Sequence, residues 1–459
     1  MVMKKLVKRY AKFSIILSVY LICTSCSGEK ENDTIKEHNY EDNQDHGQEQ
    51  EKAQAEATNS VNASDIITDT NETDMSAEVS GSEDEIGEEF LHNFYDFTEQ
   101  TSAHVFRDNV SENQIYAPLN WYLTLSMLGE LSGEEAGMEI QKVMGISEFN
   151  ASDVNNAIST LEKSRINLGR LKINTSLWLN NDLIYQEALL TKLKSEYQTE
   201  IYQGNLKDSE FQNKMTEWVS ENTSYEFKPD YHKSIDMADP YAFVSLNTLD
   251  FYNEWLFPFE EEDTFTDLFF VSDNNEISCE FMKMENPSYP FMIGEDFISS
   301  ICILKENESM LFILPEEGLS VENFLEIRGK LSGIISDWTK EQFTMGKIKL
   351  SVPKFSYVAE TNLKTTAEAM GIKKIFDSNA KAFSGFTDEN VYISDITQAS
   401  KIAIDEKGCS ASSYTEIVAY GSGVWMDEAE IILNRPFIYV LYKDKLPFLV
   451  GIVRNPLTK

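Results

Sequence analysis

The order of apolar and polar positions from residue 86 onward predicts a mixture of helices and strands. A helical period places Phe90, Leu91, Phe94 and Phe97 on one face, and similar patterns predict helices over 118–131, 211–222 and 362–370. Alternating or continuous apolar runs predict strands over 113–118, 171–179, 243–251, 310–314, 347–352 and 402–404, and two more strands within 431–453. The elements follow no regular alternation and no repeat is visible, so we expect one large α+β domain over residues 86–459.

Local signals mark several of the element ends. Ser132-Gly-Glu-Glu135 has the spacing of a capping box, which predicts that Ser132 starts a helix that Gly145 ends. Gly408 interrupts the chain just after the strand 402–404. The small and β-compatible residues that follow it contain no proline and no helix start signal, so this stretch is either an exposed loop or a strand.

Residues 27–85 have a different composition from the rest of the chain. They contain 18 acidic and three basic side chains, and Tyr40 is their one aromatic residue. Such a segment buries too little apolar surface to offset its ordering entropy, so we expect a disordered, extended spacer. The whole chain has a formal net charge of −38, which argues against nucleic-acid binding because that function needs a basic face.

The first 26 residues have the pattern of a targeting segment. A basic region ending at Lys12 precedes an apolar run over 13–22, and Thr24-Ser25-Cys26 follows. This resembles a bacterial lipoprotein signal, which implies that Cys26 is lipidated and becomes the first mature residue. A plain secretory signal is the alternative, since Cys23 stands where that pattern prefers Leu, and the apolar run is too short for a transmembrane anchor. We therefore expect an extracellular protein, anchored to the cell membrane through Cys26 or secreted.

Candidate catalytic chemistry is sparse. Of the five histidines, His92, His104 and His232 lie outside the spacer, in no triad or metal-ligand spacing. No glycine-rich phosphate loop is visible, so we expect no enzyme activity, metal or cofactor. The cysteines beyond the signal are odd in number and widely spaced, which argues against a disulfide framework. Cys279 and Cys302 lie in apolar runs, and we expect both to be buried thiols.

Six segments, taken in order, carry a family resemblance. They are 113–118 with the helix after it; Asn247 with Trp255 and Pro258-Phe259; Ser309–Pro315; Val352–Phe355 with Leu363, Met370–Ile372 and Phe383–Gly385; Ile404–Gly408; and Arg435–Phe437 with Gly451 and Asn455-Pro456. Together they resemble the serpin family over about residues 86–459. The resemblance implies three β-sheets, eight or nine helices and an exposed reactive-centre loop between Gly408 and Arg435.

The resemblance also implies a suicide inhibitor of proteases. A serine or cysteine protease cleaves the loop, and the cleaved loop inserts into the main sheet before the acyl-enzyme can be released. The implied hinge comprises Glu406, Gly408, Cys409, Ser410, Ala411, Ser412 and Ser413, whose small side chains beyond Gly408 favour insertion. We expect Arg at position 410 or 412 to turn an inhibitor into a substrate. Cys409 also admits a redox role, in which its oxidation blocks insertion.

The scissile bond is expected within Tyr420, Gly421, Ser422, Gly423, Val424, Trp425 and Met426. Counting forward from the hinge indicates Ser422, and counting back from Pro436 indicates Trp425. No Lys or Arg occurs between Lys407 and Arg435, so a trypsin-like target is not expected. Tyr420 or Trp425 suits a chymotrypsin- or subtilisin-like protease, and Ser422 or Val424 an elastase-like one.

The resemblance implies further roles for residues outside the loop. Trp255 would lie at the breach, the end of the main sheet where the loop enters. Asn113, Pro118, Asn120, Asn247 and Gln398 would form a sheet-gating cluster, in which Gln398 replaces the family's histidine and a Gln398–Asn120 amide pair is a replacement contact. The stretch 133–170 has no basic cluster, so no heparin dependence is expected, and we expect a monomer. The alternative function is a non-inhibitory serpin-fold binding lipoprotein.

Overall fold

The computed structural model describes residues 86–107, 110–162, 170–231, 242–394, 396–409 and 427–458. The chain divides into two units, Met1–Glu78 and Val79–Lys459, and every described residue belongs to the second. The predicted signal segment with Cys26, the whole spacer 27–85, and the loop positions 410–426 therefore lie outside the described residues. None of the described helices is long and apolar enough to cross a membrane.

Nine α-helices lie within the described ranges: α2 (Glu88–Val105), α3 (Pro118–Leu131), α4 (Glu134–Met144), α5 (Ala151–Glu162), α6 (Glu187–Glu196), α7 (Ser209–Asn222), α9 (Val321–Leu325), α10 (Lys330–Thr339) and α11 (Leu363–Met370). Gly145 ends α4 in the left-handed conformation, as predicted. The predicted capping box is wrong. The Ser132 hydroxyl donates to the carbonyl of Leu128 at the end of α3, and the N-cap of α4 is Gly133, which makes no side-chain hydrogen bond.

The strands are β1 (Gln114–Tyr116), β2 (Arg170–Asn180), β3 (Glu200–Gly204), β4 (Phe243–Glu254), β5 (Phe265–Ser272), β6 (Asn275–Ile293), β7 (Phe297–Ile303), β8 (Glu308–Pro315), β9 (Thr344–Pro353), β10 (Phe355–Asn362), β11 (Thr397–Ile404), β12 (Gly408–Cys409), β13 (Glu428–Ile432), β14 (Phe437–Lys443) and β15 (Leu446–Val453). Three short 3₁₀ helices, η1 (Glu261–Asp263), η2 (Lys305–Asn307) and η3 (Lys374–Phe376), complete the set.

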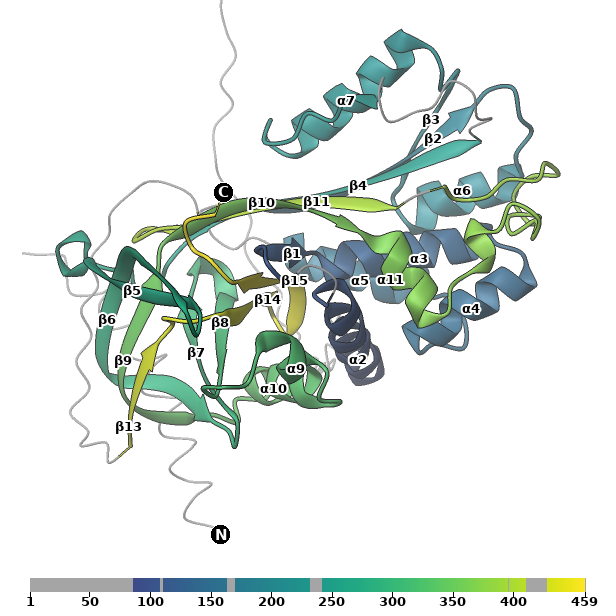
Figure 1. The fold of residues 1–459 in the computed structure, drawn as a ribbon. Coiled ribbons are helices and arrows are strands. Elements are labelled where there is room, and N and C mark those ends of the chain that lie inside the picture. Colours follow the sequence, from purple (N-terminus) through teal and green to yellow (C-terminus); the bar gives the residue numbers. More distant parts are fainter. Residues whose placement is uncertain are drawn as a thin grey trace, which may run out of the picture. The chain divides into compact units, whose positions relative to one another are not determined.

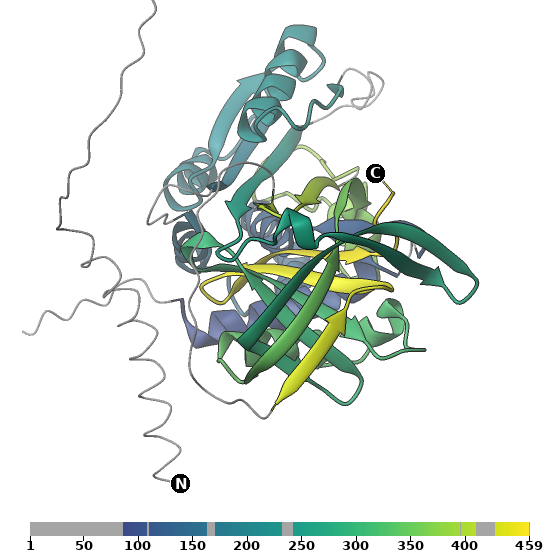
Figure 2. The ribbon, with the colours of Figure 1, turned by 90° about the vertical axis from the view of Figure 1, so that its left-hand side faces the viewer.

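These strands form three hydrogen-bonded sheets. The largest runs β1-β15-β14-β8-β7-β6-β9-β13, with β5 added to β6. The second runs β12-β4-β2-β3, and the third pairs β10 with β11 (Figure 1). β13 is parallel to β9, beside which it lies in Figure 2. Three sheets and nine helices in a mixed order confirm the expected α+β class.

The core lies around the β14–β15 hairpin and β8, in which nearly every side chain is buried. The predicted apolar face of α2 packs here, since the rings of Phe90, Phe94 and Phe97 each meet Tyr122 of α3 edge-on at 5.2–5.6 Å. Burying one such side chain stabilises the fold by about 1.5–3 kcal/mol. Cys279 and Cys302 are buried free thiols, as predicted.

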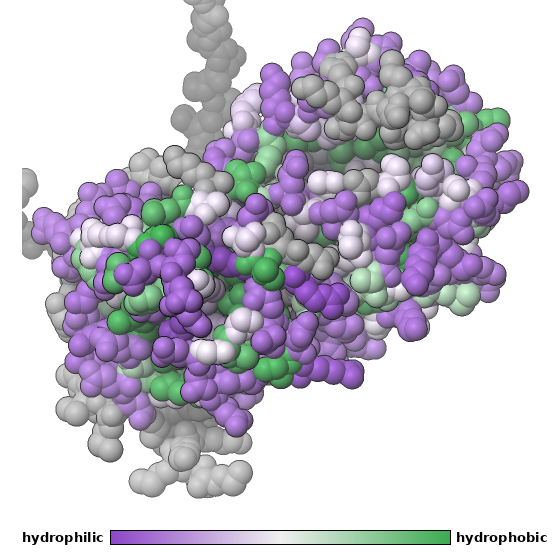
Figure 3. Space-filling model, in the orientation of Figure 1, coloured by the Kyte–Doolittle hydropathy of each residue, from purple (hydrophilic) through white to green (hydrophobic). Residues whose placement is uncertain are grey.

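A smaller cluster attaches α7 to the second sheet. Trp178 of β2 packs with Met215 and Trp218 of α7, and Val244 of β4 borders them. This places α7 on one face of the strands β2 and β4, and the opposite face points to the core. The surface shown in Figure 3 is mostly hydrophilic, in keeping with the acidic composition.

Candidate functional site

The hinge is a tight reversal at the end of β11. The backbone N–H of Asp405 donates to the carbonyl of Gly408 at 3.0 Å, and the N–H of Gly408 donates back at 3.3 Å. Gly408 has a φ of 152°, and a Cβ there would lie 2.5 Å from the carbonyl oxygen of Asn253. Only glycine fits this conformation and this close approach to β4. Gly408 thus reverses the chain and is the first residue of β12.

The reversal directs the chain between two strands. In β12, Gly408 and Cys409 pair antiparallel with Glu254 and Asn253 of β4, and Gly408 also forms a bridge to Asp405 at the end of β11. Over the described ranges no pairing joins β4 directly to β11. We call the boundary between these two strands the seam. β12 occupies one end of it.

Trp255 lies beside the hinge, where the sequence placed the breach. It is 2% exposed, and its indole N–H donates to the carbonyl of Asp405 at 2.8 Å. The backbone N–H of Trp255 donates to the carbonyl of Lys407 at 3.0 Å. The backbone N–H of Phe259 donates to the carbonyl of Glu406 at 2.9 Å. Three donors from the segment after β4 therefore bind three consecutive carbonyls of the hinge.

The Glu406 side chain is fixed as well. Its carboxylate accepts a hydrogen bond from Thr264 at 2.8 Å and forms an ion pair with Lys354 at 3.1 Å. Burial alone would raise the pKa of Glu406, but the hydrogen bonds from Thr264 and Lys354 and the lysine's charge hold it below its ordinary value. Glu406 is therefore ionised at neutral pH.

A buried polar chain that sequence reasoning missed lies beneath this point. The Asn253 amide donates to Glu308 at 2.6 Å, and Glu308 forms an ion pair with Lys443 at 3.2 Å. Lys443 also donates to the carbonyl of Leu161 in α5 at 2.7 Å. Both charged side chains are 3% exposed. The available signal was a charged residue at the end of a largely apolar strand, at Glu308 in β8 and at Lys443 in β14.

The predicted gating cluster comes together only in part. Asn247 accepts a hydrogen bond from Thr175 and donates one to the Thr124 hydroxyl, each at 2.8 Å, and Thr124 donates to the carbonyl of Asn120 at 2.8 Å. Pro118 is the first residue of α3, the helix that carries Asn120 and Thr124. Asn247 and Asn120 are thus linked through α3.

The predicted Gln398–Asn120 amide pair is wrong. The Gln398 amide instead binds both backbone groups of Ala117, accepting from its N–H at 2.6 Å and donating to its carbonyl at 3.2 Å. Asn120 is 3% exposed, and among the described residues its Oδ1 accepts no hydrogen bond. Gln398 therefore attaches β11 to the N-cap of α3 by main-chain contacts that no side-chain motif reveals.

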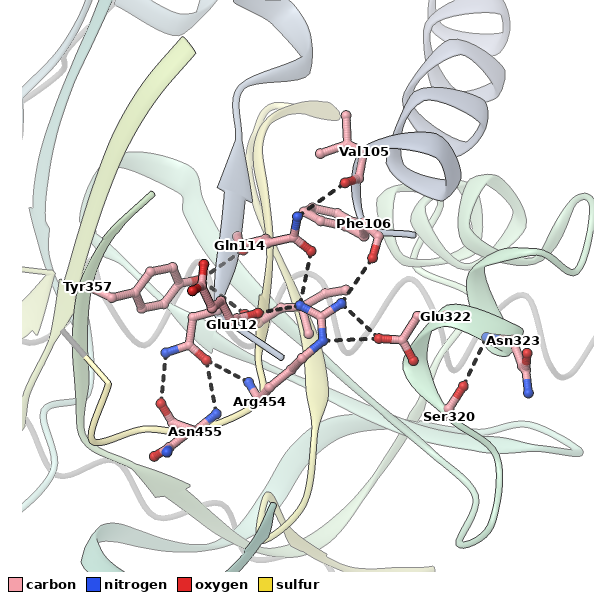
Figure 4. A network of polar contacts seen from close by, with 12 residues as sticks. Val105, Phe106, Glu112, Gln114, Ser320, Glu322, Asn323, Tyr357, Arg454 and Asn455 are labelled. Carbon is pink, nitrogen blue, oxygen red and sulfur yellow. Dashed lines mark hydrogen bonds and ion pairs between the residues drawn. The ribbon is translucent and has the colours of Figure 1, made fainter. Parts of the chain in front are cut away.

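Asn113 belongs to a different network (Figure 4). Its amide oxygen accepts from the backbone N–H groups of Arg454 and Asn455 at 2.7 and 2.9 Å. The buried Arg454 guanidinium also donates to Glu322 of α9 at 2.8 Å and to Gln114 of β1 at 3.1 Å. Asn113 therefore anchors the end of β15, and placing it in the gating cluster was wrong.

The remaining positions predicted from the sequence lie outside the part of the chain that the structure describes. Ser410–Ser413 and the scissile-bond region Tyr420–Met426 lie outside the described residues, as does Cys26. Within the described ranges, no group of three or more His, Cys, Asp or Glu side chains is arranged to hold a metal ion.

Comparison with known proteins identifies the family. A family sequence model described as serpin (serine protease inhibitor) matches residues 92–456. The chain belongs to the serpin family. Serine protease inhibitor 88Ea of Drosophila melanogaster is 24% identical over 375 residues, which cover 76% of this chain and 86% of the relative. Alpha-1-antitrypsin 1-5 of the mouse is also 24% identical and covers 86% and 95%. At family level, protease inhibition without enzyme activity is supported.

Solved serpin structures share the fold. The native state of the thermophilic serpin tengpin has a TM-score of 0.70 and 24% sequence identity, and the match covers 81% of this chain and 95% of tengpin. Human thyroxine-binding globulin has a TM-score of 0.68 and 21% identity, covering 81% of this chain and all of that protein. The latter shows that the fold also supports functions other than inhibition.

Proposed function

We propose that this serpin is a suicide inhibitor of serine or cysteine endopeptidases. The position of β12 supports the proposal most strongly. The hinge has already turned into the seam and makes its first two antiparallel pairs with β4. A strand that continued from Cys409 in the same direction would lie between β4 and β11, where it would add ladder hydrogen bonds to both strands.

Under this proposal, the register of β12 determines whether each following loop residue would face the core or the outer surface of the sheet. Continued residue by residue, it would place Ala411 opposite Phe251 and Ser413 opposite Leu249. Phe251 points to the core, where its ring lies 5.1 Å from that of Phe448. The core-facing loop positions would therefore carry small side chains, which insert into a formed core without overpacking it.

The target is proposed to be a chymotrypsin-, subtilisin- or elastase-like protease. The absence of Lys and Arg between Lys407 and Arg435 in the sequence supports this choice. At the other end of the loop, Asp427, Glu428 and Glu430 are acidic, but Glu428 and Glu430 form ion pairs with Lys347 and Lys349 of β9, so the preference for a protease with a basic rim rests mainly on Asp427. The basic and apolar regions before Cys26 support export and lipid anchoring to the cell membrane.

A non-inhibitory binding protein is the second candidate. The similarity to thyroxine-binding globulin supports it, together with a surface depression of about 420 Å³ between α2 and α10. Leu91, Tyr95, Ser332, Ser336 and Lys445 are among the residues that line it. Most of the side chains that line it are polar or charged, so a ligand there would be held by hydrogen bonds and ion pairs.

Incubating the full chain with subtilisin, chymotrypsin and elastase separates the two candidates. An inhibitor forms a covalent complex that survives denaturing electrophoresis. A binding protein is cleaved in the loop or left intact, with no complex, and that result would overturn the proposal. Trypsin is the matched negative control. Mass spectrometry of the C-terminal peptide released from the denatured complex identifies the bond within Tyr420–Met426 that is cleaved.

A further inference from the structure

The turn that follows α7 has a fixed, strained backbone. Ser224 and Tyr225 both have positive φ values, 49° and 64°, which non-glycine residues seldom adopt. The turn is closed by backbone hydrogen bonds from Tyr225 to Ser220 at 2.7 Å and from Glu226 to Thr223 at 2.9 Å. Strain of this kind persists only where surrounding contacts determine the conformation.

Those contacts reach two different sheets. The Ser224 hydroxyl donates to Asp250 of β4 at 2.6 Å, and Asp250 is itself bound by Arg170 of β2. Two residues further on, the Glu226 carboxylate forms an ion pair with Lys401 of β11. One side of the turn is thus bonded to β4 and the other to β11, the two strands that lie on either side of the seam.

The two attachment points lie at the same level along the seam. Gly408 pairs with both Glu254 and Asp405, and β12 is antiparallel to both of their strands, so β4 and β11 run in the same direction. Asp250 and Lys401 each lie four residues before these partners. Lys401 is exposed and its neighbour Ile402 is buried, so Lys401 is on the outer face of β11, the face that α7 covers on β4.

We propose that residues 223–227 are a strap that holds β11 at a fixed spacing from β4 across the seam. At Gly408, four residues along the seam from Asp250 and Lys401, β12 lies between these strands, so their spacing at that level is two strand intervals, about 10 Å. If both contacts of the strap, Ser224 to Asp250 and Glu226 to Lys401, form when β4 and β11 are separated, the strap favours the conformation into which one more strand can insert. The inference bears on inhibition only through the proposed function, but the contacts that carry it are independent of any protease.

Hydrogen exchange of the intact full chain tests the strap. Glu226→Gln or Lys401→Gln should make the amides of 397–404 exchange about two- to fivefold faster, a modest effect because the ion pair is half-exposed. Exchanging the charges in Glu226→Lys/Lys401→Glu should restore slow exchange. Added salt should speed exchange in the wild type but not in the single variants.

Lys214→Gln is the matched control, because it breaks an exposed ion pair with Glu210 within the same helix, α7. It should leave exchange in 397–404 unchanged. The proposal is overturned if exchange in 397–404 is unaffected by the single variants, if the charge exchange fails to restore it, or if protection falls equally in β14 and β15. The last result would indicate a general loss of stability.

A second measurement relates the strap to inhibition. Glu226→Gln should raise the number of inhibitor molecules consumed for each subtilisin molecule trapped, and the exchanged pair should return it to the wild-type value. If the number of inhibitor molecules consumed for each trapped subtilisin is unchanged, the strap does not affect insertion of the loop. If the wild-type chain forms no complex, the proposed function fails, and the exchange data still decide whether the strap exists.

Discussion

Glu406 and Lys354 form an ion pair, 3.1 Å between Oε1 and Nζ, that fastens the hinge to the joint between β9 and β10. Glu406 lies two residues before Gly408, so the pair holds the turn that directs the chain into the seam. The Glu406 side chain is 9% exposed and the Lys354 side chain 32%. Such a partly buried, hydrogen-bonded pair is worth more than an ordinary surface ion pair.

Glu406→Gln should destabilise the intact protein by about 1–2 kcal/mol at pH 7, measured as a lower Tm by calorimetry. The folded-state pKa of Glu406 lies below its ordinary value of 4.5, so its stabilising effect is complete above about pH 4.5. The effect disappears as the pH falls through the lowered pKa. The wild type and the variant should therefore converge in acid.

Glu261→Gln is the control for Glu406→Gln. Glu261 pairs with Lys407 of the same hinge, but at 3.6 Å and with both side chains more than half exposed. It should shift the Tm very little at any pH. A difference between the wild type and Glu406→Gln that persists or grows in acid would contradict the role of the ionised carboxylate.

The buried pair of Glu308 and Lys443 should be far more sensitive. Lys443→Met leaves the Glu308 carboxylate buried beside the Asn253 amide without its cationic partner, and should cost about 3–5 kcal/mol. The double variant Glu308→Leu/Lys443→Met removes both charges and should recover most of that loss. Thermal unfolding of the two variants checks this. A double variant no more stable than Lys443→Met would mean that the loss comes from packing.

The sequence predicted the fold better than the site because periodicity reports burial. The apolar face of α2 and the strands around 310–314 and 347–352 follow from local pattern alone. The Ser132 capping box failed because a serine hydroxyl binds equally well to the preceding helix, and only the length of α3 decides between the two.

Within the site, the positions that belong to family motifs were predictable, and the partners of individual amide side chains were not. Gly408 and Trp255 lie at the hinge, as their motifs indicated. The Gln398 side chain binds the backbone of Ala117, 281 positions away, and the Asn113 side chain binds the backbone N–H of Arg454. Amides bind any suitably placed donor or acceptor, so residue type alone cannot identify their partners.

Gln398→Ala should loosen β11 from α3. The substitution leaves the buried N–H and carbonyl of Ala117 without their side-chain partner, at a cost of about 1–3 kcal/mol. A lower Tm and faster exchange in 397–404 are expected. Gln203→Ala, at an exposed position of the edge strand β3, is the control and should change neither. Equal effects of both variants would show that the Ala117 contacts contribute nothing specific.

The register of β12 makes a sharp prediction for the loop. If an inserted strand continued this register along β4, Ala411 would lie opposite Phe251, on the core side, and Ser410 opposite Tyr252, on the outer side. The expectation that Arg at 410 or 412 blocks insertion therefore changes, because both of these positions would fall on the outer side of such a strand. The blocking substitution belongs at Ala411.

Ala411→Arg would bring a long, charged side chain into the core as the strand inserts. Overpacking costs about 1–3 kcal/mol, and the unpaired charge adds to it. Insertion should then be slower than deacylation of the acyl-enzyme. The protease therefore releases the cleaved protein, and no covalent complex accumulates. Ser410→Arg adds the same side chain one position away, towards solvent, and should leave the complex intact. The yield of complex on denaturing gels compares the two variants directly, and a loss of complex with Ser410→Arg alone would mean that the inserted strand has the opposite register.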